Sequence, residues 1–365
     1  MNGKYSREIY AAVAVCLLIV ARAIFAPHFF EDQFPTDLPG LIAAIGITIF
    51  IVTRRHGKYS REITVAAALG LLLVALAIFA PNFFELQPLL SRFTSQMPAL
   101  VAAIGITLVI ITRQIDISIG AQFSMCAVVA GLVAAAGMPL GVAVLAAVGT
   151  GIVMGAFNGI LVAWLGLPSI VVTLATMVTW NEMLRLWQQG RLLPLPDGIQ
   201  WFGLSQAAGQ GVVIAVAVVL LLAAAWAMKN LAAGRHVYAT GTDAEAARLA
   251  GIDPKRVTFG VFVLMGGLAG LAAVLNLVQS PQVQPNAGDG LELKVIAAAV
   301  VGGVAITGGR GNLWGVLLGL LLLANVNPAL THFHQPPYWE RAIQGLVILL
   351  AVVADGLKRS KKTTA

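Results

Sequence analysis

The sequence predicts an all-α membrane protein that crosses the bilayer many times, and three observations support this fold class. Of the 365 residues, 59% are hydrophobic and only 11% are charged, whereas about 25% of a typical soluble domain is charged. The apolar residues gather into windows close to the length of a membrane span, which is about 20 residues. The basic residues fall mainly between alternate windows. A soluble globular domain is therefore excluded.

Twelve apolar windows follow one another along the chain, and each is expected to form one helical span. The windows at 38–53 and 293–308 are short, so we expect them to be tilted or partly re-entrant. In order, the windows cover 9–26, 38–53, 64–80, 97–112, 117–137, 140–165, 168–187, 211–228, 257–279, 293–308, 313–330 and 342–357.

The basic residues indicate how the chain is oriented. If each window crosses once, 17 of the 23 Lys and Arg residues lie on the side of the N-terminus, 5 lie on the other side, and Arg22 lies within a window. Positive residues are enriched on the cytoplasmic side of membrane proteins, so both termini are expected in the cytoplasm. The net charge of +7 therefore reports orientation. It does not indicate nucleic-acid binding, which would need a clustered basic face with aromatic residues.

The N-terminal part of the chain is duplicated. Residues 3–31 match residues 57–85 at 21 of 29 positions, and residues 41–55 match residues 100–114 at 10 of 15 positions. This similarity predicts a tandem duplication of two spans. Residues 1–56 then form an extra two-helix segment, and residues 57–365 form a transmembrane domain of about ten spans. The first copy carries Arg22 at mid-window where the second has Leu76, so we expect the first copy to be the dispensable one.

The stretch from 234 to 256, GRHVYATGTDAEAARLAGIDPKR, is a long polar, helix-capable connection between two apolar windows. Thr242 or Asp243 is a good N-cap, and the alanine-rich run that follows favours a helix. Gly251 followed by Pro254 is a stop signal. A short surface helix between two spans is suited to docking against a cytoplasmic partner.

Sequence motifs typical of nucleotide-binding, metal-binding and catalytic sites are missing from the chain. There is no Gly-x-x-x-x-Gly-Lys-Ser/Thr phosphate loop, so the chain is not expected to bind ATP phosphates by such a loop. The glycine-rich run VGGVAITGGRG (301–311) predicts a tight turn with close helix packing. Cys16 and Cys126 are isolated in apolar windows, and His332 and His334 fit a solvated loop better than a metal site. We expect no cofactor, no metal and no enzymatic activity.

Uncharged polar residues on the later windows are candidates for a solute path. The chosen residues are Asn158, Trp180, Asn181 and Asn276. Amides both donate and accept hydrogen bonds, and an aromatic face stacks on a sugar, so this set suits a neutral, hydroxyl-rich solute. The main bundle shows no Lys or Arg at mid-span. Each amide can instead serve as a polar contact between helices, and that alternative stays open.

Four segments of the chain resemble the permease subunits of bacterial ABC importers of the ribose, xylose, rhamnose and autoinducer-2 class. One of them, the segment 234–252, is similar to the coupling loop of importer permeases, with Glu245-Ala246-Ala247 and Gly251 at the expected separation. ITRQIDISIG and MCAVVAG favour the autoinducer-2 and rhamnose branch. The four segments are ITRQIDISIGAQFSMCA (111–127), FNGILVAWLGLPSIVVTLATM (157–177), GRHVYATGTDAEAARLAGI (234–252) and GDGLELKVIAAAVVGGVAITGGRGNLWG (288–315).

This resemblance implies an inner-membrane transporter subunit with several partners. They are a second permease subunit, identical or a sister chain, cytoplasmic ATP-binding subunits and a periplasmic sugar-binding protein. Asp243, Glu245, Ala246, Ala247 and Gly251 would couple the permease to the ATPase during alternating access. The alternative is a stand-alone secondary transporter or channel. That alternative would need carboxylates at mid-span, whereas Asp116, Asp289 and Glu292 lie near window ends.

Overall fold

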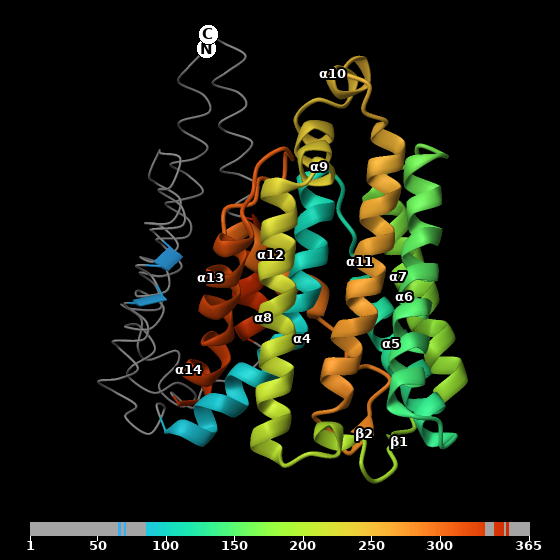
Figure 1. The fold of residues 1–365 in the computed structure, drawn as a ribbon, viewed down its shortest axis with the longest axis vertical. Coiled ribbons are helices and arrows are strands. Elements are labelled where there is room, and N and C mark those ends of the chain that lie inside the picture. Colours follow the sequence, from blue (N-terminus) through green and yellow to red (C-terminus); the bar gives the residue numbers. More distant parts are fainter. Residues whose placement is uncertain (1–64, 67–68, 71–84, 333–338, 347, 350–365) are drawn as a thin grey trace, which may run out of the picture.

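The computed structural model describes residues 65–66, 69–70, 85–332, 339–346 and 348–349. The duplicated segment 1–56 lies outside these residues. Within them the protein is a bundle of helices with one two-stranded antiparallel sheet (Figure 1). The elements are α4 (Leu86–Ile111), α5 (Ile119–Ala135), α6 (Leu140–Ala163), α7 (Ser169–Gln188), β1 (Leu193–Pro194), η3 (Gln200–Gly203), α8 (Gln206–Asn230), α9 (Ala232–Thr242), α10 (Ala244–Leu249), α11 (Pro254–Leu277), β2 (Gln282–Val283), α12 (Leu291–Val301), α13 (Leu313–Ala324) and α14 (Val326–His332).

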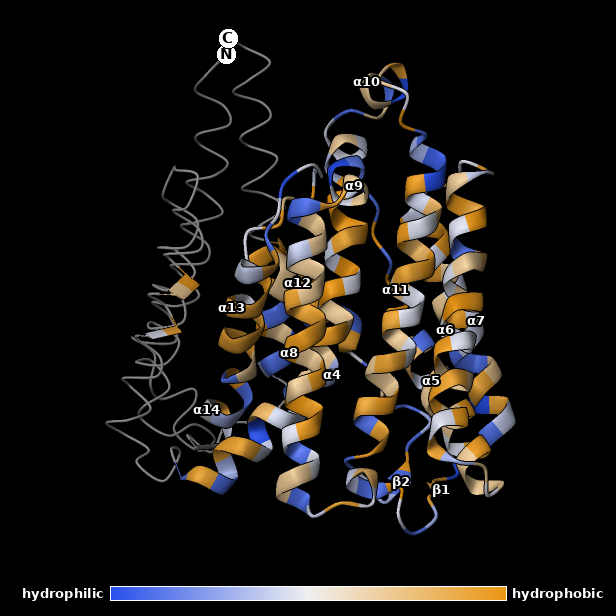
Figure 2. Cartoon of the chain, in the orientation of Figure 1, coloured by the Kyte–Doolittle hydropathy of each residue, from blue (hydrophilic) through white to orange (hydrophobic). Residues whose placement is uncertain are grey.

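Helix α4 is the centre of the bundle. It packs against α8, α11, α12 and α13, and 89% of its most apolar stretch is buried, compared with 17% for α8. Hydrophobic residues cover the helices, while hydrophilic residues gather at the two ends of the bundle (Figure 2). We call the end that carries α9 and α10 the loop end, and the end that carries β1 and β2 the sheet end.

Helices α6 and α11 run antiparallel, and glycines bring their backbones into contact. A Cβ atom on Gly151 would overlap the carbonyl oxygen of Gly266, and one on Gly155 would overlap that of Phe262. A Cβ on Gly270 would lie 2.8 Å from Cα of Val148. Small residues allow this close approach in a membrane bundle, where apolar side chains gain little by leaving lipid. Glycines spaced four residues apart on each helix, Gly151 and Gly155 on α6 and Gly266 and Gly270 on α11, therefore place the two backbones against each other.

Two non-helical segments enter the bundle from opposite ends. Residues 112–118 lead from the loop end of α4 inward to the start of α5 (Figure 1). Residues 284–290 lead from β2 to the start of α12. The second segment packs against the first turns of α5: the N–H of Gly288 donates to Oγ of Ser124 at 2.9 Å, and a Cβ on Gly288 would overlap the carbonyl oxygen of Gly120. Non-helical backbone at membrane depth is tolerated only where protein or a water-filled cavity surrounds it.

The described helices agree with most of the predicted windows. Four of them, α4, α6, α8 and α11, are long and apolar enough to cross a membrane. Helix α7 covers the window 168–187, and α5 covers most of 117–137. The short window 293–308 contains an 11-residue helix, α12. The window 313–330 is interrupted at Asn325, between α13 and α14. The windows before residue 64 lie outside the described residues.

Candidate functional site

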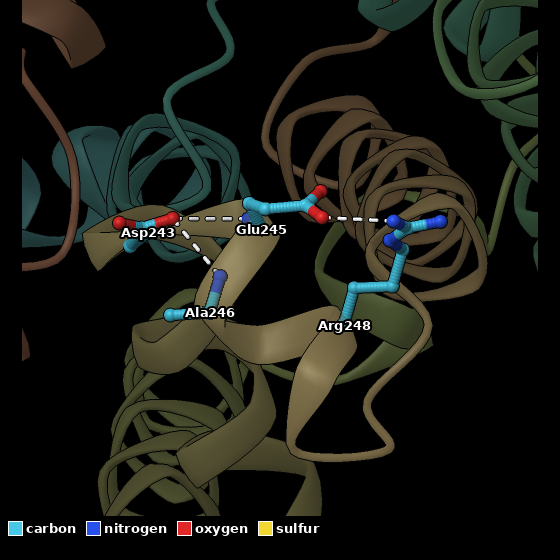
Figure 3. A network of polar contacts seen from close by, with 4 residues as sticks. All are labelled: Asp243, Glu245, Ala246 and Arg248. Carbon is cyan, nitrogen blue, oxygen red and sulfur yellow. Dashed lines mark hydrogen bonds and ion pairs between the residues drawn. The ribbon is translucent and has the colours of Figure 1, made fainter.

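Helix α10 is capped at its start by Asp243. One carboxylate oxygen of Asp243 accepts hydrogen bonds from the backbone N–H groups of Glu245 at 3.0 Å and Ala246 at 3.1 Å (Figure 3). These are two of the N–H groups that a helix start leaves unpaired. Of the two caps that the sequence offered, Asp243 is the one used. Thr242 is instead the last residue of α9, and its hydroxyl donates to the carbonyl of Tyr238 at 2.8 Å.

Helix α10 is closed at its end by Gly251. The N–H of Gly251 donates to the carbonyl of Arg248 at 3.0 Å, and the N–H of Ile252 donates to that of Ala247 at 3.0 Å. This pair of bonds forms a Schellman motif. Gly251 has φ of +81° and nothing lies within 4 Å of where a Cβ would be. Glycine is therefore required here for conformation, not for space.

The surface of α10 carries one ion pair and one large apolar side chain that is exposed to solvent. Arg248 and Glu245 form an ion pair of 2.8 Å, with both side chains about two-thirds exposed. The hydrogen bond from Arg248 to Glu245, with the charge of Glu245, raises the pKa of Arg248. Ala247 is buried, whereas Leu249 is 80% exposed. An exposed leucine beside a charge pair suits contact with another protein, and sequence reasoning had not singled out Leu249.

The connection around α10 is more structured than predicted. The sequence suggested one polar stretch from 234 to 256, but α9 occupies its first part. Two glycines weaken the helix signal of α9, and tertiary contacts hold it, since Val237, Thr240 and Gly241 are buried. The next helix begins at Pro254 with Asp253 as its N-cap. Pro254 therefore starts α11 at a position where proline fits. The expected start near residue 257 was wrong.

A second polar group, the interior cluster, comprises Asp116, Ser118, Gln122 and Asn158. All four are fully buried. Asp116 accepts from the backbone N–H of Ser118 at 2.7 Å and from its hydroxyl at 2.5 Å. The amide groups of Gln122 and Asn158 donate to the other carboxylate oxygen at 3.2 and 3.3 Å. Both amides also donate to Oγ of Ser118 at 2.9 Å. The carboxylate thus has four uncharged donors.

The position of Asp116 corrects the expectation that it lies at the end of a span. The chain turns back into the bundle after Arg113, so Asp116 is carried inside by the segment 112–118. The carbonyl oxygens of the Gln122 and Asn158 side chains are buried without a hydrogen-bond partner. Such groups are costly unless paired. The cluster is therefore a polar centre at the junction of α5, α6 and the segment 112–118.

The four predicted path residues do not form one cluster in this chain. Asn158 belongs to the interior cluster and is closed to solvent. Trp180 and Asn181 are half-buried on α7, and the Trp180 ring lies 6.3 Å from that of Phe157. Asn276 lies in the last turn of α11, towards the sheet end. Since α6 and α11 are antiparallel, with Gly270 against Ala147, Asn158 and Asn276 are about 25 Å apart along the bundle.

Two charged residues, Glu292 and Lys294, lie closer to the interior of the bundle than the sequence suggested. Glu292 and Lys294 are half-buried in the first turn of α12, not in an outer connection. The Glu292 carboxylate lies over Gly120, where a Cβ would overlap it. Their position follows from the segment 284–290, which carries the start of α12 into the bundle. The sequence signal was the charged run Asp289-Gly-Leu-Glu-Leu-Lys294 immediately before an apolar window.

Comparisons with known proteins agree with this architecture. Residues 89–352 match a family described as branched-chain amino acid transport system / permease component. The chain is 38% identical over 301 residues to the autoinducer 2 import system permease protein LsrC of Salmonella typhi, which covers 82% of this chain and 87% of that protein. The LsrC proteins of Yersinia pseudotuberculosis and Escherichia coli K12 are 36% and 35% identical over the same share of this chain, and 86% and 88% of their own lengths are covered.

No solved structure matches this chain. The family match covers more than half of the sequence, and its relatives are named as permeases, which are transport subunits and not enzymes. The apolar helices and the family together make it a multi-pass protein of the inner membrane. The chain therefore belongs to the family described as permease components of branched-chain amino acid transport systems. The resemblance to the permeases of ABC sugar importers is confirmed.

Proposed function

We propose that this chain is the permease subunit of an ABC importer that moves a neutral, sugar-like solute of the autoinducer-2 type into the cell. The observation that carries the proposal is α10, a capped helix that stands at one end of the bundle with Glu245, Arg248 and Leu249 exposed. The names of the relatives support the class of solute.

The loop end is the cytoplasmic end in this proposal. Basic residues gather there, including Arg113, Arg235 and Arg256, as the positive-inside rule expects. Both termini then lie in the cytoplasm. The sequence has no phosphate loop, so ATP is hydrolysed by separate subunits that dock below the membrane. The solute arrives at the sheet end on a periplasmic sugar-binding protein.

The five coupling residues have distinct parts in this proposal. Asp243 and Gly251 fix the two ends of α10 by its cap and its Schellman motif. Ala247 is buried and holds the helix against the bundle. Glu245 and Ala246 are exposed on the first turn and are available to the ATPase. Closure of the ATPase subunits would push α10 and switch the bundle between inward- and outward-facing states.

The solute path is proposed between this chain and a second permease subunit. Trp180 and Asn181 are half-buried on α7, where the exposed Glu182–Arg185 pair, 3.3 Å apart, also lies. Charged and amide groups are costly against lipid, so this face of α7 is better matched to protein or water. Asn276 reaches the path from the sheet end. Asn158 acts from inside, through the interior cluster.

A panel of labelled solutes tests the proposal. Cells that carry the operon with and without this gene are compared for uptake of autoinducer-2, rhamnose, ribose and xylose. We expect uptake of one of these neutral solutes to require the gene. Uptake that is specific for an anion or a peptide would contradict the proposed cargo.

The buried carboxylate of Asp116 is the observation that favours the second candidate, a stand-alone secondary transporter, because such transporters use intramembrane carboxylates. Deleting the ATPase gene while keeping the permease separates the two functions. The importer loses uptake completely in that strain. A secondary transporter keeps uptake and loses it when an ionophore collapses the ion gradient.

A further inference from the structure

Three parts of the chain meet at the loop end in what we call the glycine junction: residues 111–113 at the end of α4, residues 241–242 at the end of α9, and residues 308–311 before α13. A Cβ on Gly241 would overlap the carbonyl oxygen of Ile111 and would lie 2.8 Å from the backbone nitrogen of Gly309. The N–H of Gly309 donates to that same carbonyl at 2.9 Å. At these points backbone therefore meets backbone directly.

Two side chains tie the glycine junction together further. The Arg113 guanidinium donates to the carbonyl of Thr242, and the Tyr238 hydroxyl donates to the carbonyl of Gly311 at 2.8 Å. Burial raises the pKa of Tyr238, so its hydroxyl stays a neutral donor. Arg113 has φ of +63°, a region that costs a non-glycine residue free energy. The surrounding contacts hold it there.

The chain leaves the glycine junction directly into the membrane interior. Residues 114–118 are fastened to α7 because Oγ of Ser169 accepts from the N–H of Ile115 at 3.1 Å, and Oγ1 of Thr173 accepts from that of Ile117 at 3.1 Å. The same segment ends in the interior cluster on α5 and α6. A continuous line of tight contacts thus joins α9, next to α10, to the polar centre of the bundle.

We propose that the glycine junction transmits the movement of α10 to the segment 112–118 and the interior cluster, and that Gly241, Gly309 and Tyr238 are positioning residues for transport. This inference rests on the proposed function. Where Gly241 meets Ile111 and Gly309, the contacts are between backbone atoms, so displacement of the end of α9 is passed on there and is not absorbed by a flexible side chain. Helix α11 also follows α10, but residues 250–253, which include the positive-φ Gly251, separate the two helices.

Alanine substitutions at two glycines test the proposal with a matched control. Gly241→Ala forces the junction apart, whereas Gly260→Ala adds the same methyl to α11 where nothing lies within 4 Å. Each variant is purified with its ATPase subunits and reconstituted in closed lipid vesicles. The readouts are ATPase co-purification, basal ATP hydrolysis and solute transported per ATP. For Gly241→Ala we expect normal docking and hydrolysis but about tenfold less transport per ATP. Gly260→Ala should behave as the unmodified protein.

Tyr238→Phe keeps the test decisive if Gly241→Ala fails to fold. It removes one hydroxyl and no packing volume, and the loss of one hydrogen bond is expected to lower transport per ATP about twofold to tenfold. An unchanged ratio in Tyr238→Phe and in any folded Gly241→Ala would overturn the proposal, as would an equal loss in Gly260→Ala. Failure of the unmodified complex to couple transport to ATP would instead contradict the proposed function itself.

Discussion

The connection around α10 and the segment 112–118 both reverse the chain, but they are built in opposite ways. Every hydrogen bond that caps α10 joins residues within five positions of each other. The segment 112–118 instead depends on Asn158, Ser169 and Thr173, which lie 40 to 58 positions away from the groups they bind. One is exposed and shaped locally, and the other is buried and shaped by the whole bundle. A permease that is driven by a separate subunit needs both an exposed reversal and a buried one.

Asp116→Ala should have the largest effect, because it attacks the buried reversal. It would leave the N–H and hydroxyl of Ser118 without an acceptor, and the amides of Gln122 and Asn158 would keep only Oγ of Ser118. Each unpaired buried group costs about 1–3 kcal/mol, so we expect a large loss of folded yield and thermal stability. Asp116→Asn keeps one acceptor oxygen and should lose much less. Thermal unfolding in detergent compares the two variants, and an unchanged melting temperature for Asp116→Ala would contradict the role of the cluster.

Gly251→Val should have a smaller and more local effect, because it attacks the exposed reversal. Valine at φ of +81° is strained by about 1–2 kcal/mol or more, which distorts the exit of α10. The bundle should keep its melting temperature, while ATPase co-purification is lost. Gly251→Asn is the control, since asparagine tolerates positive φ. If valine and asparagine bind the ATPase equally, the shape of this turn does not matter for docking.

Asp243→Ala sharpens the same comparison from the other end of α10. Losing an N-cap costs a helix about 0.5–2 kcal/mol, so the α10 amides should exchange hydrogen faster and ATPase binding should weaken. Asp243→Ser retains a capping oxygen and should restore most of the protection. Hydrogen exchange read by mass spectrometry measures this directly. Equal exchange in the alanine and serine variants would show that the cap does not stabilise α10.

Deletion of residues 1–56 should have the smallest effect. A chain that starts before Gly57 keeps the repeated start GKYSREI and all of the windows after the duplicated segment. We expect normal membrane insertion and normal solute uptake from the shortened protein. Normal insertion with lost uptake would show that the duplicated pair of windows has a function in transport.

The sequence predicted the exposed reversal well because its shape is local. The capping carboxylate, the alanine-rich run and Gly251 lie within nine residues, and each acts on its immediate neighbours. The sequence did not reveal α9. Its two glycines lower the helix propensity of this stretch, and tertiary contacts stabilise the helix. The sequence also did not reveal that Leu249 is exposed, because exposure depends on where α10 stands relative to the bundle.

The buried reversal could not be predicted in the same way. A window of apolar residues beginning at 117 is compatible with a carboxylate outside the membrane or inside it, and only the fold around Arg113 decides. Asn158 was predicted to contact the solute, but its amide donates to Asp116 and Ser118 within the interior cluster. These partners lie at least 40 positions away in the sequence, so local pattern could not reveal them. Windows 293–308 and 313–330 were similarly ambiguous, since the entry of residues 284–290 and the break at Asn325 depend on neighbouring helices.

Cross-linking from Leu249 tests most directly the central claim that α10 docks an ATPase. Both native cysteines, Cys16 and Cys126, are first replaced by alanine, and a single cysteine is then placed at Leu249 or, as a control at the sheet end, at Leu192, which is also exposed. The complex is treated with a short bifunctional reagent in native membranes. We predict that Leu249→Cys joins the permease to the ATP-binding subunit and that Leu192→Cys does not. No cross-link from Leu249, or an equal one from Leu192, would contradict the account.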